Sequence, residues 1–253
     1  MHARTRLFKF KNLSHISVYT ELQGRTFHDV LGLLIPFLKS SPNLVSLSFA
    51  CGDPNRDLAY SPVDLVASLG ENFTFPHLRI FRLHGCIDPN WPAFLERQSL
   101  EADPLRRFFA RHPRIEVLAF NSDFESLPHD IDPSYLLRIF PCLKSFEGSS
   151  PLLVSVLLTF SEQLENIVIT DGIADDTLKK LYYGIPTLPK LRRLAILGFS
   201  GNGILTRLFR ALVKAARELE EIEFRPLANY NGSSSLTVPS CDYVRVFQSL
   251  CFF

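Results

Sequence analysis

The sequence predicts an α/β solenoid of about eight irregular repeats, in which each repeat adds one strand to a parallel sheet and one helix that covers it. The frame Pro-x-Leu/Ile-x-x-apolar-x-apolar, as in Pro76–Leu83, recurs at intervals of 21 to 37 residues. Self-similarity at such a period is typical of solenoids, because a single strand–helix unit cannot bury its own apolar face. Helix start signals lie between the frames. We therefore expect a curved horseshoe with the sheet on its concave face and the helices on its convex face.

The strands are expected where the frames begin, and the frames carry apolar side chains at their first, fourth and sixth positions, except that the frame of Leu143 has glycine at its sixth position. Side chains alternate between the two faces of an extended strand, so the fourth and sixth positions point into the core and the third and fifth point away. Strand, helix and strand in succession place the strands parallel. The frames begin at Leu13, Leu44, Leu78, Ile115, Leu143, Leu164, Leu191 and Leu219.

Five frames carry a proline two residues before their first apolar position. Because proline disfavours helical geometry in the residue before it, we expect each of these prolines to end the preceding helix. They are Pro42, Pro76, Pro113, Pro141 and Pro189.

Helices are expected between the frames, where a capping residue followed by proline marks each start. Serine or aspartate accepts a hydrogen bond from a free N–H group of the first turn, and proline fits the first helical position. Apolar residues at helical spacing follow, as in Leu105, Phe108 and Phe109, so each helix has a face to bury. The capping pairs are Ser61-Pro62, Asp103-Pro104, Asp132-Pro133 and Ser150-Pro151.

The repeats predict one continuous domain over residues 1–228, of which residues 1–12 lead into the first strand. Residues 229–240 are rich in turn formers and are expected to be a flexible loop. Residues 241–253 return to an apolar pattern with Val244, Phe247 and Leu250 at helical spacing. A short capping helix over the last repeat is the expectation for this segment.

The composition restricts the function classes. The 253 residues carry a formal net charge of +1, so no overall field favours nucleic acid or an anionic membrane. The N-terminus lacks the apolar core of a secretory signal. The five cysteines include no Cys-x-x-Cys pair, which argues against a disulfide scaffold or a zinc site. We expect a cytoplasmic or nuclear protein that binds neither nucleic acid nor membrane and uses no cofactor.

The frame resembles that of leucine-rich-repeat proteins, and its irregular lengths resemble the repeat region of fungal F-box proteins. The resemblance covers residues 7–224, although the family pattern Leu-x-x-Leu-x-Leu-x-x-Asn/Cys is completed only at Cys86. His2–Phe10 resembles the segment that follows an F-box, whereas the F-box itself has no counterpart here. The resemblance implies a non-enzymatic protein-interaction module, the target-recognition part of an F-box-like ubiquitin-ligase adaptor, without docking on a Skp-type adaptor.

Partner recognition would fall on the outward strand positions of the concave face, where arginine and aromatic residues tend to anchor interfaces. Substituting Tyr19, Arg82 and His84 together is expected to abolish partner binding, whereas substituting Arg207 and Arg210 on an outer helix is not. The expected partner-binding residues are Tyr19, Ile80, Arg82, His84, Asn121, Glu147, Asn166, Arg193, Glu221 and Glu223.

Cys86 and His84 flank Gly85 and invite interpretation as a nucleophile–base pair. In the repeat family the position of Cys86 is structural. Three further groups lack the spacing of a phosphate loop or a metal site, and turns or helix caps account for them. They are Gly201–Gly203, the aspartates at 171, 175 and 176, and His129–Asp132.

Two alternatives remain open from the sequence. One is an enzyme on an irregular α/β scaffold, which a deep pocket holding two or more of these His, Asp or Cys residues would favour. The other is a truncated F-box paralogue without function.

Overall fold

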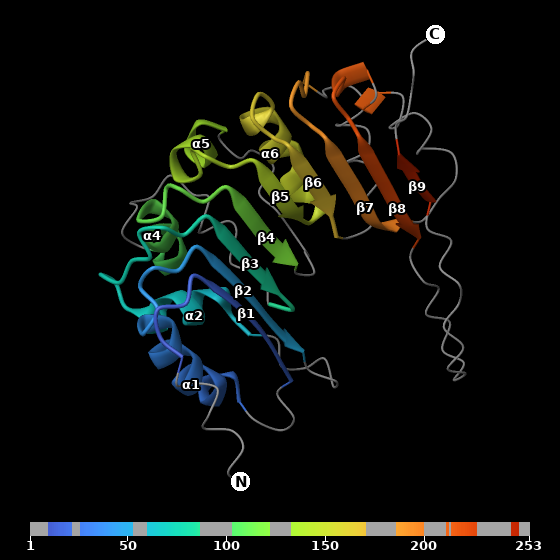
Figure 1. Cartoon of the computed structure of the whole chain (residues 1–253). Helices are drawn as coiled ribbons and strands as arrows, with labels where there is room; N and C mark the ends of the chain where they lie inside the picture. Colours follow the sequence, from blue (N-terminus) through green and yellow to red (C-terminus); the bar gives the residue numbers. More distant parts are fainter. Residues whose placement is uncertain are drawn as a thin grey trace, which may run out of the picture. The chain divides into compact units, whose positions relative to one another are not determined.

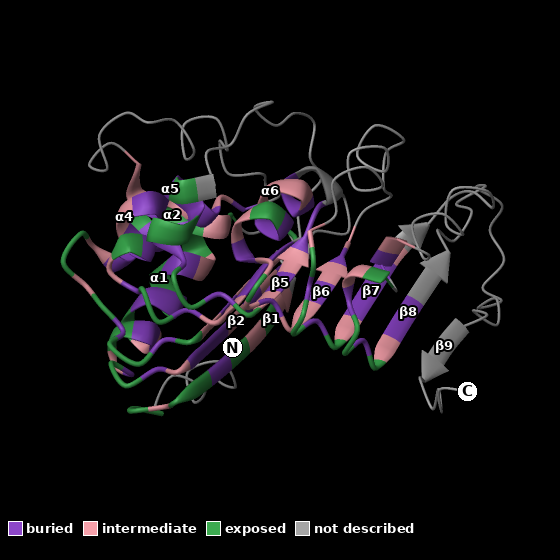
Figure 2. Cartoon of the chain, turned by 90° about the horizontal axis from the view of Figure 1, so that it is seen from above, coloured by how far each residue is buried: buried purple, intermediate pink, exposed green. Residues whose placement is uncertain are grey.

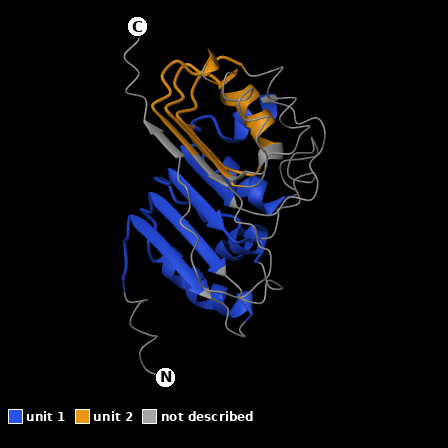
Figure 3. Ribbon diagram, turned by 90° about the vertical axis from the view of Figure 1, so that its right-hand side faces the viewer, with its two compact units in different colours: residues 1–143 blue, residues 144–253 orange. Residues whose placement is uncertain are grey.

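The computed structural model describes residues 10–21, 26–52, 60–86, 103–121, 133–170, 186–199, 211–212, 214–226 and 244–247. The chain forms two compact units, residues 1–143 (unit 1) and residues 144–253 (unit 2), coloured separately in Figure 3. Each unit is an α/β structure whose strands follow one another in chain order. The predicted α/β class is therefore confirmed.

Unit 1 contains four parallel strands with helices between them (Figure 1). The neighbouring strands pair in register, so that His15 lies opposite Ser46 and Ser46 opposite Ile80. The elements are β1 (His15–Glu21), α1 (Phe27–Lys39), β2 (Ser46–Gly52), α2 (Pro62–Leu69), β3 (Ile80–His84), α4 (Pro104–Ala110), β4 (Val117–Asn121) and α5 (Pro133–Ile139).

Unit 2 continues the same order with four parallel strands and one antiparallel strand at its end. Helix α6 packs against β5. The elements are β5 (Ser145–Gly148), α6 (Ser150–Phe160), β6 (Asn166–Ile169), β7 (Arg193–Phe199), β8 (Glu221–Pro226) and β9 (Val244–Phe247).

All eight predicted strands form, and each strand begins two residues after the first apolar residue of its frame. In six of the eight frames the first apolar residue instead closes a turn, in which its N–H donates to the carbonyl three residues earlier, as from Leu44 to Ser41, Leu78 to Phe75 and Ile115 to His112. The five frame prolines occupy the second position of such turns, which suits their fixed φ. Helix α2 already ends at Leu69, well before Pro76, so the prediction that Pro76 ends that helix is wrong.

The predicted alternation of buried and outward strand positions is also confirmed. In β3 the side chains of Phe81 and Leu83 are fully buried, whereas those of Ile80, Arg82 and His84 are partly exposed. Figure 2 shows the buried positions of the strands and the helices that cover them on one side. The core of each unit therefore lies between the helices and one face of its strands.

Phenylalanine rings fill much of the core of unit 1. Phe81 contacts Phe108 and Phe109 at centroid distances of 5.2 and 5.5 Å, and Phe109 contacts Phe120 and Phe140 at 6.0 and 4.8 Å. These rings come from successive repeats. Three of these four contacts are edge-on, and such contacts add to the gain from apolar burial, so the repeats stabilise one another through their shared rings.

Two of the four predicted helix caps are confirmed. The Ser61 hydroxyl accepts from the N–H of Asp64, and the Asp103 carboxylate accepts from the N–H of Arg106 at 2.9 Å. The third cap, Asp132, lies outside the described residues. The fourth is displaced by one residue, because α6 begins at Ser150 and Ser149 occupies the cap position.

The helix predicted over residues 241–253 is wrong where the structure describes it. Val244–Phe247 form strand β9, which pairs antiparallel with β8 and sets Val246 opposite Ile222. Without β9 the outer edge of β8 would leave N–H and C=O groups unpaired, and a strand satisfies these groups where a helix would not. The loop predicted over residues 229–240 lies outside the described residues, and the single domain over residues 1–228 stays a prediction.

Candidate functional site

The face of the strands that points away from the helices, called the open face below, carries the outward positions predicted for partner binding. Strand alternation places its side chains. In unit 1 the described side chains of the open face are His15, Ser17, Tyr19, Ser46, Ser48, Ala50, Ile80, Arg82, His84, Val117 and Ala119. In unit 2 they are Ser145, Glu147, Asn166, Val168, Arg193, Ala195, Leu197, Glu221 and Glu223.

Tyr19 and His84 stand on either side of a small residue in unit 1. The register sets Tyr19 beside Ala50 and Ala50 beside His84. Neighbouring strands lie about 4.8 Å apart, so Tyr19 and His84 are roughly 10 Å apart across the sheet. Only the methyl group of Ala50 lies between them. Tyr19 is 71% exposed, whereas His84 is half-buried. An aromatic ring held by a rigid strand and open to solvent is a suitable anchor for a partner.

Arg82 lies in the adjacent row of the same face. The register places Ser48 between Ser17 and Arg82, so the arginine again borders a small residue. The residue is half-buried, and its guanidinium forms no ion pair with a carboxylate among the described residues. Tyr19, Arg82 and His84, which were each predicted to bind a partner, therefore share one surface of unit 1, on strands β1 and β3.

Two other predicted residues of unit 1 adjoin this surface. Ile80 begins β3 and is half-buried beside Ser46 and Val117. Asn121 ends β4 in register with His84, and only its backbone is described.

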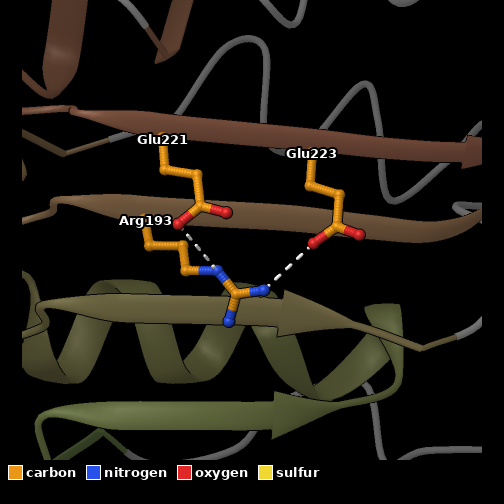
Figure 4. Close-up of polar contacts among 3 residues, drawn as sticks. All are labelled: Arg193, Glu221 and Glu223. Atoms are coloured by element: carbon orange, nitrogen blue, oxygen red, sulfur yellow. Dashed lines mark hydrogen bonds and ion pairs between the residues drawn. The ribbon is translucent and has the colours of Figure 1, made fainter. Parts of the chain in front are cut away.

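In unit 2 the structure brings Arg193 together with two glutamates of the neighbouring strand (Figure 4). The guanidinium of Arg193 lies 3.3 Å from Glu221 and 3.0 Å from Glu223. Arg193 thus bridges two acidic side chains on β8, and the three groups neutralise one another in part. A cation already engaged in this way is less available to a partner than Arg82.

Glu223 corrects the expectation of an exposed partner contact. Its residue is only 4% exposed, and its carboxylate accepts a hydrogen bond from Arg193. The sheet continues past β8, because β9 pairs with it and Arg245 stands opposite Glu223. A carboxylate in the interior of a sheet must be paired, since burial of an isolated charge is costly. Glu223 therefore positions Arg193 and is buried away from solvent.

Glu147 and Asn166 are half-buried on the open face of unit 2. Asn166 pairs with Arg193 in register, and Glu147 pairs with Val168 on the next strand. Of the predicted residues in unit 2, Asn166 and Arg193 therefore lie side by side with Glu221.

Cys86 has a structural environment. It is 4% exposed and forms a parallel bridge with Tyr60, a ring that packs at 4.9 Å against Phe49. Burial, and then the neighbouring Cys86 and Cys51, raise the pKa of the Tyr60 hydroxyl well above its usual value. A buried thiol beside a neutral phenol lacks the positive surroundings that activate a cysteine.

Gly85 is required by the turn between His84 and Cys86. Its φ is +70°, and a Cβ added there would lie 2.6 Å from the carbonyl oxygen of Cys51. The glycine lets the end of β3 lie close to the end of β2. Close packing therefore explains why glycine precedes Cys86, without any catalytic role.

The other groups that suggested chemistry, at residues 129–132, 171–176 and 201–203, lie outside the described residues. Within the described part of the chain, no cluster of three His, Cys, Asp or Glu residues could hold a metal ion. A groove of about 430 Å³ between α1 and α2 contains none of the residues predicted for chemistry. It is lined by Phe27, His28, Leu31, Asp64, Ala67 and Ser68.

His112 was missed in the sequence analysis. It is 2% exposed, its Nε2 accepts from the N–H of Phe75 at 2.9 Å, and its Nδ1 lies 2.6 Å from the carbonyl of Phe108. The neutral ring therefore carries its proton on Nδ1. Burial lowers the pKa of His112 to about 4, although the bond to Phe108 opposes this. Ser41, two repeats earlier, also accepts a hydrogen bond from the backbone of the preceding repeat, because its hydroxyl accepts from the N–H of Leu13. The shared signal is a polar residue directly before a frame proline.

Among the described residues no helix is long and apolar enough to cross a membrane. No protein-family model matches the chain, and no curated protein matches its sequence.

Proposed function

We propose that this chain is a leucine-rich-repeat protein-interaction module that binds a partner protein through the open face of unit 1. The supporting observation is the surface formed by Tyr19, Arg82 and His84, which rigid strands hold beside small residues and which no described helix covers. Aromatic and arginine side chains in such a setting are typical interface anchors.

The more specific proposal is that the module recognises targets for an F-box-like ubiquitin ligase. It rests on the likeness of the repeat frame and of His2–Phe10 to fungal F-box proteins. The chemistry of this role is binding alone, and it needs neither a metal nor a cofactor. The partner would contact the open face side chains, while the buried strand positions maintain the sheet.

The test is capture of partners by the tagged chain in cells, followed by mass spectrometry. The Tyr19→Ala/Arg82→Ala/His84→Ala variant is expected to lose at least tenfold of a specifically captured partner. Removal of one anchor side chain typically weakens binding by about 1–2 kcal/mol. Removal of all three should therefore cost more than the roughly 1.4 kcal/mol that corresponds to a tenfold loss. Stability against urea is measured in parallel.

The matched control is the His28→Ala/Leu33→Ala/Lys39→Ala variant of α1, which changes three exposed residues of similar type on the helical side. It is expected to retain the partner. If the α1 variant loses the partner and the open-face variant keeps it, the binding surface proposed here is wrong.

A further inference from the structure

Strand β1 has an unpaired outer edge among the described residues. It pairs with β2 on one side only, whereas β8, the last parallel strand, is followed by the antiparallel strand β9. An uncovered edge presents a row of N–H and C=O groups to which another strand can bond.

The groups that β1 presents can be assigned. The carbonyl of Ser14 accepts from Ser46 of the next strand, so the backbone groups of Ile16, Val18 and Thr20, which follow at two-residue steps, point toward β2. The backbone groups of Ser17 and Tyr19 then point outward. These residues offer two donors and two acceptors at the free edge.

The sequence of β1 does not block this edge. Natural edge strands are commonly protected by lysine, proline or a bulge. Strand β1 reads His-Ile-Ser-Val-Tyr-Thr-Glu, and its pairing with β2 runs without a break over all seven residues. A long, regular and unprotected edge favours the addition of another strand.

Helix α1 beside this edge also exposes apolar surface. Val30, Leu33 and Phe37 follow one another at helical spacing and do not line the groove toward α2. Leu33 is 51% exposed. Phe10, which is 56% exposed, lies at the C-terminal end of the same helix, where its carbonyl accepts from Ser40. The terminal repeat of a solenoid normally needs a polar outer face or a cap.

We propose that the β1 edge associates with the β1 edge of a second copy of this chain, forming an antiparallel pair about a two-fold axis. The sequence is self-complementary in a register centred on Val18, which sets His15 opposite Glu21 of the second copy and Ser17 opposite its Tyr19. The first pair joins a basic residue type with an acidic one. Both pairs consist of residues whose backbone groups point outward, which the alternation of antiparallel hydrogen bonds requires.

The two-fold axis also accounts for the apolar residues. It stands perpendicular to the sheet, so both α1 helices lie on the same side and meet across the joined edges. The stripe of Val30, Leu33 and Phe37 would then face its own copy, and the contact would exceed a single pair of strands. Because the backbone carries this association, it is independent of partner binding by side chains of the open face.

The test measures the mass of the full chain by analytical ultracentrifugation across the micromolar range. The expected result is a concentration-dependent rise toward twice 28.8 kDa. Tyr19→Pro removes an outward N–H without removing a bond to β2, and is expected to leave the monomer. Tyr19→Ala is the matched control, because it removes the same side chain but keeps the N–H, and it is expected to dimerise.

A second variant tests the register and does not depend on the folding of Tyr19→Pro. Val18→Cys is made in a background that carries serine in place of Cys142, Cys241 and Cys251, so that only the buried Cys51 and Cys86 remain beside it. It is expected to form a disulfide-linked dimer on mild oxidation, whereas the serine background alone is not. Val18 would face its own copy in a non-hydrogen-bonded pair about 4.5 Å apart, within the range of a disulfide. A wild-type monomer at every concentration, a folded Tyr19→Pro dimer or an unlinked Val18→Cys variant would overturn the proposal.

Discussion

His112 links two repeats through its ring, because the same side chain accepts from the N–H of Phe75 and donates to the carbonyl of Phe108. The ring also packs on Phe108, with centroids 4.1 Å apart. The bond from Phe75 needs the neutral ring, since a protonated Nε2 would be a donor facing another donor, whereas the bond to Phe108 can form in either protonation state.

The stability of the fold is therefore expected to depend on pH through His112. Its pKa falls from 6.5 to about 4 on folding, so the unfolded chain binds a proton between these values that the folded chain does not. The contribution is present in full above pH 6.5 and is lost as the pH falls toward 4. The loss reaches about 3 kcal/mol in the free energy of unfolding, measured by urea titration.

Two variants separate this contribution from that of other groups. His112→Phe replaces the imidazole with a ring that does not titrate. It should therefore flatten the dependence of the free energy of unfolding on pH in this range. It should also lower stability at neutral pH by about 1–3 kcal/mol, because the N–H of Phe75 loses its acceptor. His77→Gln, which alters an exposed histidine of the same unit, is the matched control variant. An unaltered slope in His112→Phe would contradict the assignment.

Gly85 and Gly32 provide opposite predictions for the same substitution. Gly85→Ala is expected to destabilise unit 1 by roughly 2–4 kcal/mol, because of the positive φ and the carbonyl of Cys51 that the methyl would meet. Gly32→Ala, in α1 with nothing within 4 Å of an added Cβ, is expected to stabilise by about 0.5–1 kcal/mol. Urea unfolding of both variants checks the two signs, and equal effects would refute the argument.

At the scale of elements, the helix caps differ in a way that the sequence does not reveal. Asp103 accepts from the N–H of Arg106, whereas the hydroxyl of Ser149 is buried and has no hydrogen-bond partner. Asp103→Ala is expected to lower the free energy of unfolding by about 1 kcal/mol. Ser149→Ala is expected to be neutral or stabilising, because it removes an unpaired buried hydroxyl. Thermal unfolding distinguishes the two, and a larger loss in Ser149→Ala would contradict this account.

Strand positions could be predicted from the sequence because the frame expresses a local rule. Apolar residues at the fourth and sixth positions, as in Phe81 and Leu83, must share one face of a strand. The start of each strand could not be placed to the residue, since the turn that delays it depends on a hydrogen bond back to the end of the preceding segment. The spacing of apolar residues in Val244–Phe247 fits either a helix or a strand. The segment forms a strand because its backbone then pairs with the outer edge of β8.

At the scale of the whole molecule, the repeats stabilise one another because no repeat closes its own core. Phe109 contacts rings from β3, β4 and the segment after α5. Burial of each such side chain contributes about 1.5–3 kcal/mol. Contacts of this kind join neighbours within unit 1, so a change at one interface should act on the repeats at either side.

The sequence by itself determined the α/β class, the order of the strands and the division of their residues between core and open face. Periodicity suffices there, because burial of apolar side chains acts on residues close in the chain. The tertiary structure alone decided which outward residues are available. It brought Arg193 to two glutamates of the next strand, of which Glu223 is 30 residues away, buried Glu223 and left Tyr19 exposed on an edge strand. These differences arise from neighbours distant in sequence and from the geometry of the strand edges, neither of which a local pattern encodes.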